Sequence, residues 1–216
     1  GFGSRSGTAR LRRFPEPHCR SAARIVTQRF DFAIVGAGIA GASLAAGLAP
    51  HGRVALLEAE DRPGYHATGR SAAFWTESYG GPMVQPLTTA SRGFFDDHAL
   101  LTERGALTLA RAEEREGLEA FIAEFSALGV RVEPLDRAAL EARLPGLRSE
   151  WQLGAFEPDC CDIDVAALHQ LWLTEAARLG TDLKCRARLV QAHRGAAGWQ
   201  LGLADGCSLS ARVLIN

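Results

Sequence analysis

The chain has 216 residues, of which 47% are hydrophobic, and its formal net charge is -1 at pH 7. This length and apolar content suffice for a substantial core in one large domain or two small ones. A nearly neutral charge gives no long-range attraction to nucleic acid or anionic lipid, and no stretch approaches the roughly 18 apolar residues of a membrane helix. We therefore expect no nucleic-acid partner and no transmembrane segment, while attachment to a membrane surface stays open.

Cysteine usage indicates a reducing compartment. The five cysteines form no C-x-x-C pair and are Cys19, Cys160, Cys161, Cys185 and Cys207. Their number is odd, and the adjacent pair cannot easily close on itself. We expect reduced, chemically idle thiols and a cytoplasmic protein, and the abundance of alanine and arginine favours a bacterial one.

Residues 1–29 have a different composition from the rest of the chain. They contain seven arginines and one acidic residue, Glu16, with no apolar period. Such a segment is typical of a disordered leader, and a transit peptide or an upstream artefact of cloning or gene prediction is the alternative. Because the only methionine is Met83, we expect translation to start before Gly1 or the first residues to have been removed.

From residue 30 the sequence changes to short apolar runs separated by glycine. Residues 30–35 are predicted to form a strand, residues 39–49 a helix and residues 53–57 a second strand. Two strands joined by a helix within about thirty residues indicate a parallel pair with a right-handed crossover.

The remaining sequence predicts more helices and strands. Ser71 is a candidate cap for a short helix, and Asp164 is the expected N-cap of a longer helix that stops at Gly180. Predicted helices cover residues 83–100, 113–128, 137–144 and 164–179. Predicted strands cover residues 105–111, 130–134, 182–185, 188–193, 199–203 and 209–216. Together they predict an α/β fold with an added antiparallel portion.

A glycine-rich motif lies between the first predicted strand and the first predicted helix: Gly36-Ala37-Gly38-Ile39-Ala40-Gly41. In this context the first glycine permits a tight turn, the second lets a pyrophosphate approach the backbone, and the third lets helix and strand pack closely. The N–H groups at the helix start then hold the diphosphate. Residues 30–58 are therefore predicted to form an ADP-binding βαβ unit.

Glu58 ends the second predicted strand and is followed by Ala59. A carboxylate at this place can accept hydrogen bonds from both ribose hydroxyls of an adenosine, which disfavours a 2′-phosphate. The alternative is a plain glycine turn with a solvated carboxylate. The motif by itself does not separate FAD from NAD.

The segment Gly64-Tyr65-His66-Ala67-Thr68-Gly69-Arg70-Ser71-Ala72-Ala73 resembles the loop after the second strand in the D-amino-acid-oxidase-like family of FAD oxidoreductases. The sequence of this segment is most similar to that of the D-arginine dehydrogenase branch. The resemblance to the family extends from Phe30 to the end of the chain. It implies a Rossmann-like FAD-binding domain of glutathione-reductase type over residues 30–216, with the start of an antiparallel substrate-domain insertion. It also implies an incomplete chain, because the family's substrate-binding arginine and its second flavin-contacting segment come later.

The resemblance implies FAD as the cofactor and residues 61–76 as a flavin loop. A hydroxyl at Thr68 and a guanidinium at Arg70 suit diphosphate oxygens, although a small polar loop that only caps a helix is the alternative. Near Arg188 a strand is expected to contact adenine through its backbone. The position of the contacting residue is open by one residue. The expected cofactor-binding residues are Gly36, Gly38, Ile39, Ala40, Gly41, Glu58, Ala59, Thr68, Gly69, Arg70, Ser71, Ala73 and Leu189.

The implied reaction is oxidation of a D-amino acid or secondary amine by hydride transfer from its α-carbon to flavin N5, followed by hydrolysis to a 2-oxo acid and ammonia. Tyr79 is the candidate catalytic residue at the substrate edge. Phe74 departs from the polar ring of arginine-selective relatives, so the substrate side chain stays open. The electron acceptor, oxygen or a membrane quinone, stays open too.

Three alternatives remain. An FAD-dependent hydroxy-acid or glycerol-phosphate dehydrogenase would share the glycine motif but should lack the segment Gly64 to Ala73. A catalytically inactive FAD-binding fragment would share both the motif and this segment. His66 could attach a flavin covalently, whereas a loop histidine that only forms hydrogen bonds is the simpler interpretation.

Overall fold

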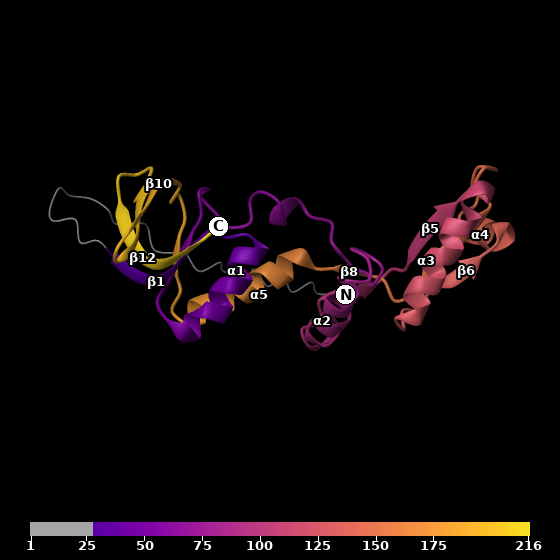
Figure 1. Cartoon of the computed structure of the whole chain (residues 1–216), viewed down its shortest axis with the longest axis horizontal. Helices are drawn as coiled ribbons and strands as arrows, with labels where there is room; N and C mark the ends of the chain where they lie inside the picture. Colours follow the sequence, from indigo (N-terminus) through magenta and orange to yellow (C-terminus); the bar gives the residue numbers. More distant parts are fainter. Residues whose placement is uncertain (1–27) are drawn as a thin grey trace, which may run out of the picture.

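The computed structural model describes residues 28–216, so most of the expected leader, residues 1–27, lies outside the described part. Gln28 and Arg29 do not belong to a leader, because strand β1 begins at Gln28. The described chain is elongated and has three groups of elements along its long axis (Figure 1). Within residues 28–216, no helix has the length and apolar character needed to cross a bilayer.

The first group is a six-stranded sheet with the order β10-β11-β12-β1-β2-β9. Its strands are β1 (Gln28–Val35), β2 (Val54–Leu57), β9 (Asp182–Lys184), β10 (Leu189–Gly195), β11 (Gly198–Leu203) and β12 (Ser208–Ile215). The strands from β12 to β9 run parallel, while β10 and β11 extend the sheet in antiparallel fashion. Helices α1 (Ile39–Leu48) and α5 (Val165–Arg178) belong to this group (Figure 1). The predicted parallel pair around one helix is confirmed.

The second and third groups are antiparallel and lie away from the large sheet (Figure 1). The middle group consists of the sheet β3-β8-β4 and helix α2: β3 (Phe74–Trp75), β8 (Cys161–Ile163), β4 (Leu101–Glu103) and α2 (Gln85–Asp97). The distal group consists of the sheet β5-β7-β6 and two helices: β5 (Ala106–Ala110), β7 (Leu153–Glu157), β6 (Glu133–Leu135), α3 (Arg115–Ala127) and α4 (Arg137–Arg143). Three 3-10 turns complete the description: η1 (Ala49–His51), η2 (Thr68–Arg70) and η3 (Ala112–Glu114).

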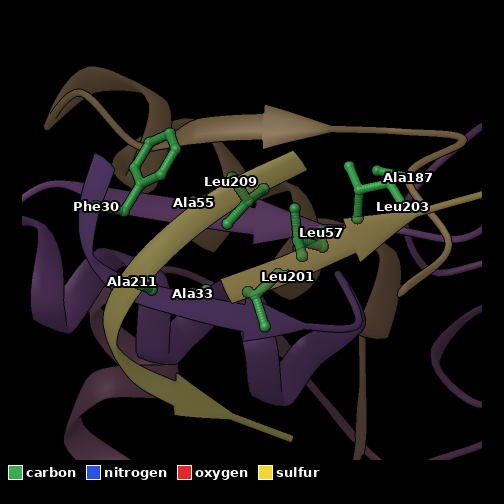
Figure 2. Packing of buried hydrophobic residues seen from close by; sticks show 9 residues of the cluster. All are labelled: Phe30, Ala33, Ala55, Leu57, Ala187, Leu201, Leu203, Leu209 and Ala211. Carbon is green, nitrogen blue, oxygen red and sulfur yellow. The ribbon is translucent and has the colours of Figure 1, made fainter. Parts of the chain in front are cut away.

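Strand β2 explains why the large sheet is buried on both faces. Its four residues are all buried, and they alternate between two clusters. Val54 and Leu56 pack in the cluster that includes residues of α1 and α5, whereas Ala55 and Leu57 pack with residues of β11 and β12 (Figure 2). A continuous apolar strand covered on both faces is typical of a parallel sheet.

The middle of the chain differs from the predicted elements at two places. Ser71 does not cap a helix: it follows η2 in an extended conformation, and the chain continues into β3, which pairs with β8. No element was predicted between residues 144 and 164, where the structure forms β7 and β8. Both strands gain their hydrogen bonds from residues far away in the sequence, so local patterns do not reveal them.

Other predicted elements are present with small shifts. Asp164 caps α5 by accepting a hydrogen bond from the Ala167 N–H at 2.8 Å. Helix α2 is shorter than predicted, since Pro86 lies in its first turn and Ala99 has a positive φ of 52°. Helix geometry requires a negative φ, so the helix cannot continue through Ala99.

Cys160 and Cys161 are buried at the start of β8. Burial is the main cause that raises the pKa of each thiol above its usual range, and burial likewise raises the pKa of Cys185. A raised pKa keeps these thiols protonated at neutral pH, and the thiolate is the reactive form.

Truncation of Leu56 should destabilise the large sheet. Leu56 is fully buried, so Leu56→Ala is expected to lower the free energy of unfolding by about 2–5 kcal/mol. The matched control is Leu87→Ala on α2, where the native side chain is 73% exposed and the expected change is within about 0.5 kcal/mol. Urea unfolding followed by circular dichroism measures both. Equal effects would contradict the assignment of β2 to the core.

The buried cysteines should resist alkylation while the chain is folded. In a Cys19→Ser background, Cys160 and Cys161 are expected to react slowly with iodoacetamide at pH 8 and rapidly in guanidinium. Because their folded pKa values are raised, their contribution to stability is complete below the unfolded thiol pKa of about 8.5 and is lost as the pH rises through the folded values. Mass spectrometry of the modified protein measures the rates, and fast labelling of the folded chain would count against burial.

Candidate dinucleotide-binding site

The turn between β1 and α1 is held in place by close contacts. The Gly36 N–H donates to the Leu57 carbonyl at 2.7 Å, and Gly36 has a φ of +94°. A Cβ on Gly41 would lie only 1.9 Å from the Gly36 carbonyl oxygen. Helix α1 therefore begins directly against the turn, at the carboxyl edge of β1 and β2, where ligands bind in parallel sheets.

Glu58 directs its carboxylate into this turn. The side chain is 7% exposed, and its Oε2 accepts a hydrogen bond from the Ala37 N–H at 3.1 Å while Oε1 accepts from the Glu60 N–H at 3.1 Å. The Glu58 carbonyl accepts from the Ala187 N–H at 2.7 Å, just before β10. The carboxylate is therefore fixed beside the glycine turn rather than solvated, and each oxygen keeps a second lone pair for a hydroxyl donor.

Thr68 reaches the start of α1 from the loop that follows β2. Its Oγ1 accepts a hydrogen bond from the Ile39 N–H at 2.9 Å. A Cβ on Gly38 would lie 2.9 Å from the same hydroxyl oxygen. The first turn of α1 itself contains no acidic residue that would repel an anion. The glycine turn and the Thr68 hydroxyl thus fit a diphosphate.

The other expected cofactor-binding residues lie in η2, between η2 and β3, and at the start of β10. The Gly69 N–H donates to the Gly64 carbonyl at 2.7 Å, and the Ser71 N–H donates to the Thr68 carbonyl at 3.3 Å. Ala73 accepts a hydrogen bond from the Ile163 N–H at 2.9 Å. Leu189 begins β10 and packs against the cluster of Figure 2, near Glu58.

Arg70 lies over an aromatic ring of its own loop. Its guanidinium lies over the ring of Tyr65, 5.4 Å from the ring centroid, and the Arg62 guanidinium lies at the same distance. His66 pairs with Glu60, with 3.0 Å between Nε2 and Oε1. This contact fits the interpretation of His66 as a hydrogen-bonding loop residue.

An open cavity of about 510 Å³ lies between this loop and α5. It is lined by residues 62–65 and 68–71 of the loop and by Val165, Ala166, His169 and Gln170 of α5. A second hollow of about 410 Å³ lies in the distal group, around Arg115 and Asp136. Only the first adjoins the glycine turn.

His169 is a buried residue of this site that sequence reasoning missed. It is 9% exposed, and its Nε2 lies 2.8 Å from the Ala37 carbonyl oxygen. Its spacing of three from Trp172 puts it on the same face of α5 as this residue, which packs against the core. A polar residue on an otherwise apolar helix face was the available signal.

Tyr79 lies in the loop between β3 and α2 and is 78% exposed. This loop is anchored by Glu157 of β7, whose buried carboxylate accepts hydrogen bonds from the Thr76 hydroxyl at 3.1 Å and the Ser78 hydroxyl at 2.6 Å. Sequence reasoning missed Glu157 as well, because its partners lie about eighty residues away. These two hydrogen bonds hold the loop on both sides of Glu77, and the Tyr79 ring is exposed.

A glycine turn, a carboxylate at the end of the second strand and a helix N-terminus aimed at an anion define a dinucleotide-binding domain. Residues 31–216 match the family described as FAD dependent oxidoreductase (DAO), and the chain belongs to this family, whose cofactor is FAD. The expected fold class is confirmed.

Solved structures share this fold at low sequence identity. Glycine oxidase from Geobacillus kaustophilus superposes with a TM-score of 0.74 and 23% identity, over 87% of this chain and 55% of its own. NikD, an unusual amino acid oxidase essential for nikkomycin biosynthesis, gives 0.72 and 23%, over 87% and 51%. L-alpha-glycerophosphate oxidase from Mycoplasma pneumoniae gives 0.76 and 14%, over 87% and 53%. The chain thus spans about half the length of these proteins.

Two glycines of α1 allow a matched test of the turn. In Gly41→Ala the new Cβ would meet the Gly36 carbonyl, which should displace the turn and weaken FAD binding at least about tenfold. In Gly47→Ala the new Cβ meets nothing within 4 Å, so FAD affinity should be unchanged and the free energy of unfolding should rise by about 0.5–1 kcal/mol. Quenching of flavin fluorescence measures the affinity. Native affinity in Gly41→Ala would refute the role of the turn.

Proposed function

We propose that the protein oxidises a D-amino acid or a secondary amine with FAD, giving a 2-oxo acid and ammonia in the first case. The observation that carries this proposal is the Thr68 hydroxyl at the start of α1. Thr68 belongs to the segment Gly64 to Ala73, whose sequence resembles that of amino-acid-oxidising members of the family. Glycine oxidase and NikD, both amino acid oxidases by name, support this class of substrate.

Each predicted residue then has a role toward FAD. The N–H groups of Gly38, Ala40 and Gly41 hold the diphosphate. Those of Gly36, Ala37 and Ile39 instead fix the turn, through Leu57, Glu58 and Thr68. Glu58 and the adjacent Ala59 bind the ribose, and the backbone at Leu189 contacts adenine. The loop residues Thr68, Gly69, Arg70, Ser71 and Ala73 border the diphosphate and the ring. Bound FAD supplies the hydride acceptor of the reaction.

The middle group of elements provides the substrate side. Tyr79 is the proposed catalytic residue, on a loop fixed through Thr76 and Ser78 to Glu157. The chain's part in the reaction is to orient the substrate carbon and exclude water. Phe74 is covered by the Arg104 guanidinium at 4.1 Å from its centroid. A cation at this place supports a substrate without a cationic side chain, because like charges repel.

A hydroxy-acid or glycerol-phosphate oxidoreductase is the second candidate. The glycerophosphate oxidase has a TM-score of 0.76, slightly above the 0.74 of glycine oxidase. Since the chain spans about half of these proteins, an FAD-binding unit without activity of its own is the third candidate.

Anaerobic reduction of the flavin separates the three candidates. The protein, expressed in its natural reading frame, should lose its visible flavin absorbance with D-alanine or sarcosine and keep it with L-alanine and with glycerol 3-phosphate. Oxygen uptake compared with reduction of a quinone analogue then identifies the electron acceptor. Bleaching by glycerol 3-phosphate alone would establish the second candidate, and a flavin that no substrate bleaches would establish the third.

A further inference from the structure

His169 and Glu58 hold the two sides of the same residue. Ala37, the middle residue of Gly36-Ala37-Gly38, is fully buried. Its N–H donates to Glu58 Oε2 at 3.1 Å and its carbonyl lies 2.8 Å from His169 Nε2. Because a carbonyl can only accept, Nε2 carries the proton in this contact. Both peptide groups of Ala37 are therefore fixed by side chains from other elements.

The same imidazole touches the loop that carries Thr68. Gly64 has a φ of +74°, and a Cβ there would lie 2.7 Å from the Cε1 atom of His169. The Gly64 carbonyl accepts the Gly69 N–H at 2.7 Å, which closes the loop immediately around Thr68. One ring thus sets the position of the glycine turn and of the loop that supplies the Thr68 hydroxyl.

Burial of a polar ring is unfavourable unless its hydrogen bonds are made. A leucine or phenylalanine on α5 could fill the same volume, but neither could donate to the Ala37 carbonyl. An N–H donor at this place fixes the orientation of the Ala37–Gly38 peptide, whose N–H belongs to the turn that binds the diphosphate. Such preorganisation lowers the cost of ordering the site on binding.

We propose that His169 is a positioning residue of the FAD site: its Nε2–H holds the Ala37 carbonyl, so that the glycine turn has its diphosphate-binding conformation before FAD arrives. The proposal depends on FAD binding at this turn and is independent of the substrate. Of the described groups around the ring, Ala37 provides the acceptor and Gly64 provides the contact surface.

Two substitutions separate the hydrogen bond from the volume of the ring. His169→Phe keeps a buried ring and loses the donor, so the FAD dissociation constant should rise about tenfold, as for loss of one hydrogen bond. His169→Gln retains an N–H donor at similar reach and should stay within about threefold of the native value. The matched control is His98→Phe, at the residue that follows α2. It loses a contact of His98 Nδ1 with the Phe94 carbonyl at 2.8 Å and should bind FAD like the native chain.

A purely structural role would move a different quantity. If His169 served only packing, His169→Phe would bind FAD with native affinity, and this result would overturn the proposal. A His169→Gln variant that binds FAD no better than His169→Phe would overturn it as well. Urea unfolding of the apoproteins shows whether each variant is folded at the temperature of the titration. A native chain that binds no FAD would instead refute the site itself.

The native protein offers a test that needs no variant. Nitrogen-15 NMR of histidine-labelled protein should show His169 with its proton on Nε2, and that proton should exchange slowly with water because the ring is buried. A neutral ring with its proton on Nδ1 would overturn the proposal even if His169→Phe failed to fold.

Discussion

The site depends on one close approach, that of α1 to the carbonyl of Gly36. Only a residue without a Cβ can stand at position 41, because a Cβ there would overlap the Gly36 oxygen at 1.9 Å. This contact puts the positive end of α1 at the carboxyl edge of the sheet, beside the end of β2. The Thr68 hydroxyl, the Glu58 carboxylate and the Ala37 peptide groups are all positioned relative to that helix start. A wider turn would separate the helix from each of them.

Most buried polar side chains in the described residues form their hydrogen bonds with loops rather than with helices or strands. Glu58 and His169 hold the glycine turn, and Glu157 holds the loop that carries Tyr79. Each connects segments far apart in sequence, and each is satisfied by hydrogen bonds, as burial requires. The chain therefore fixes both loops with polar side chains that follow β2 and lie on α5 and on β7.

Locally determined features were predictable from sequence. The βαβ unit follows from apolar runs and glycine positions, and α5 follows from its Asp164 cap and Gly180 stop. The strands β3, β7 and β8 were missed, because short strands are stabilised by partners that no local window contains. His169 and Glu157 were missed for the same reason: their roles come from Ala37, Thr76 and Ser78, which only the folded chain brings near. The roles of Tyr79 and of all the expected cofactor-binding residues stay predictions.

The parallel register between β1 and β12 has a consequence for how the chain folds. Strand β1 lies between β2, which follows it closely in sequence, and β12, which is about 180 residues further along. During synthesis the ADP-binding half of the sheet can form early, but its inner strand keeps one open edge until residues 208–215 leave the ribosome. An exposed edge on an apolar strand invites pairing with other chains. The two antiparallel groups between α1 and α5 are synthesised in that interval, so their length sets how long the edge stays open.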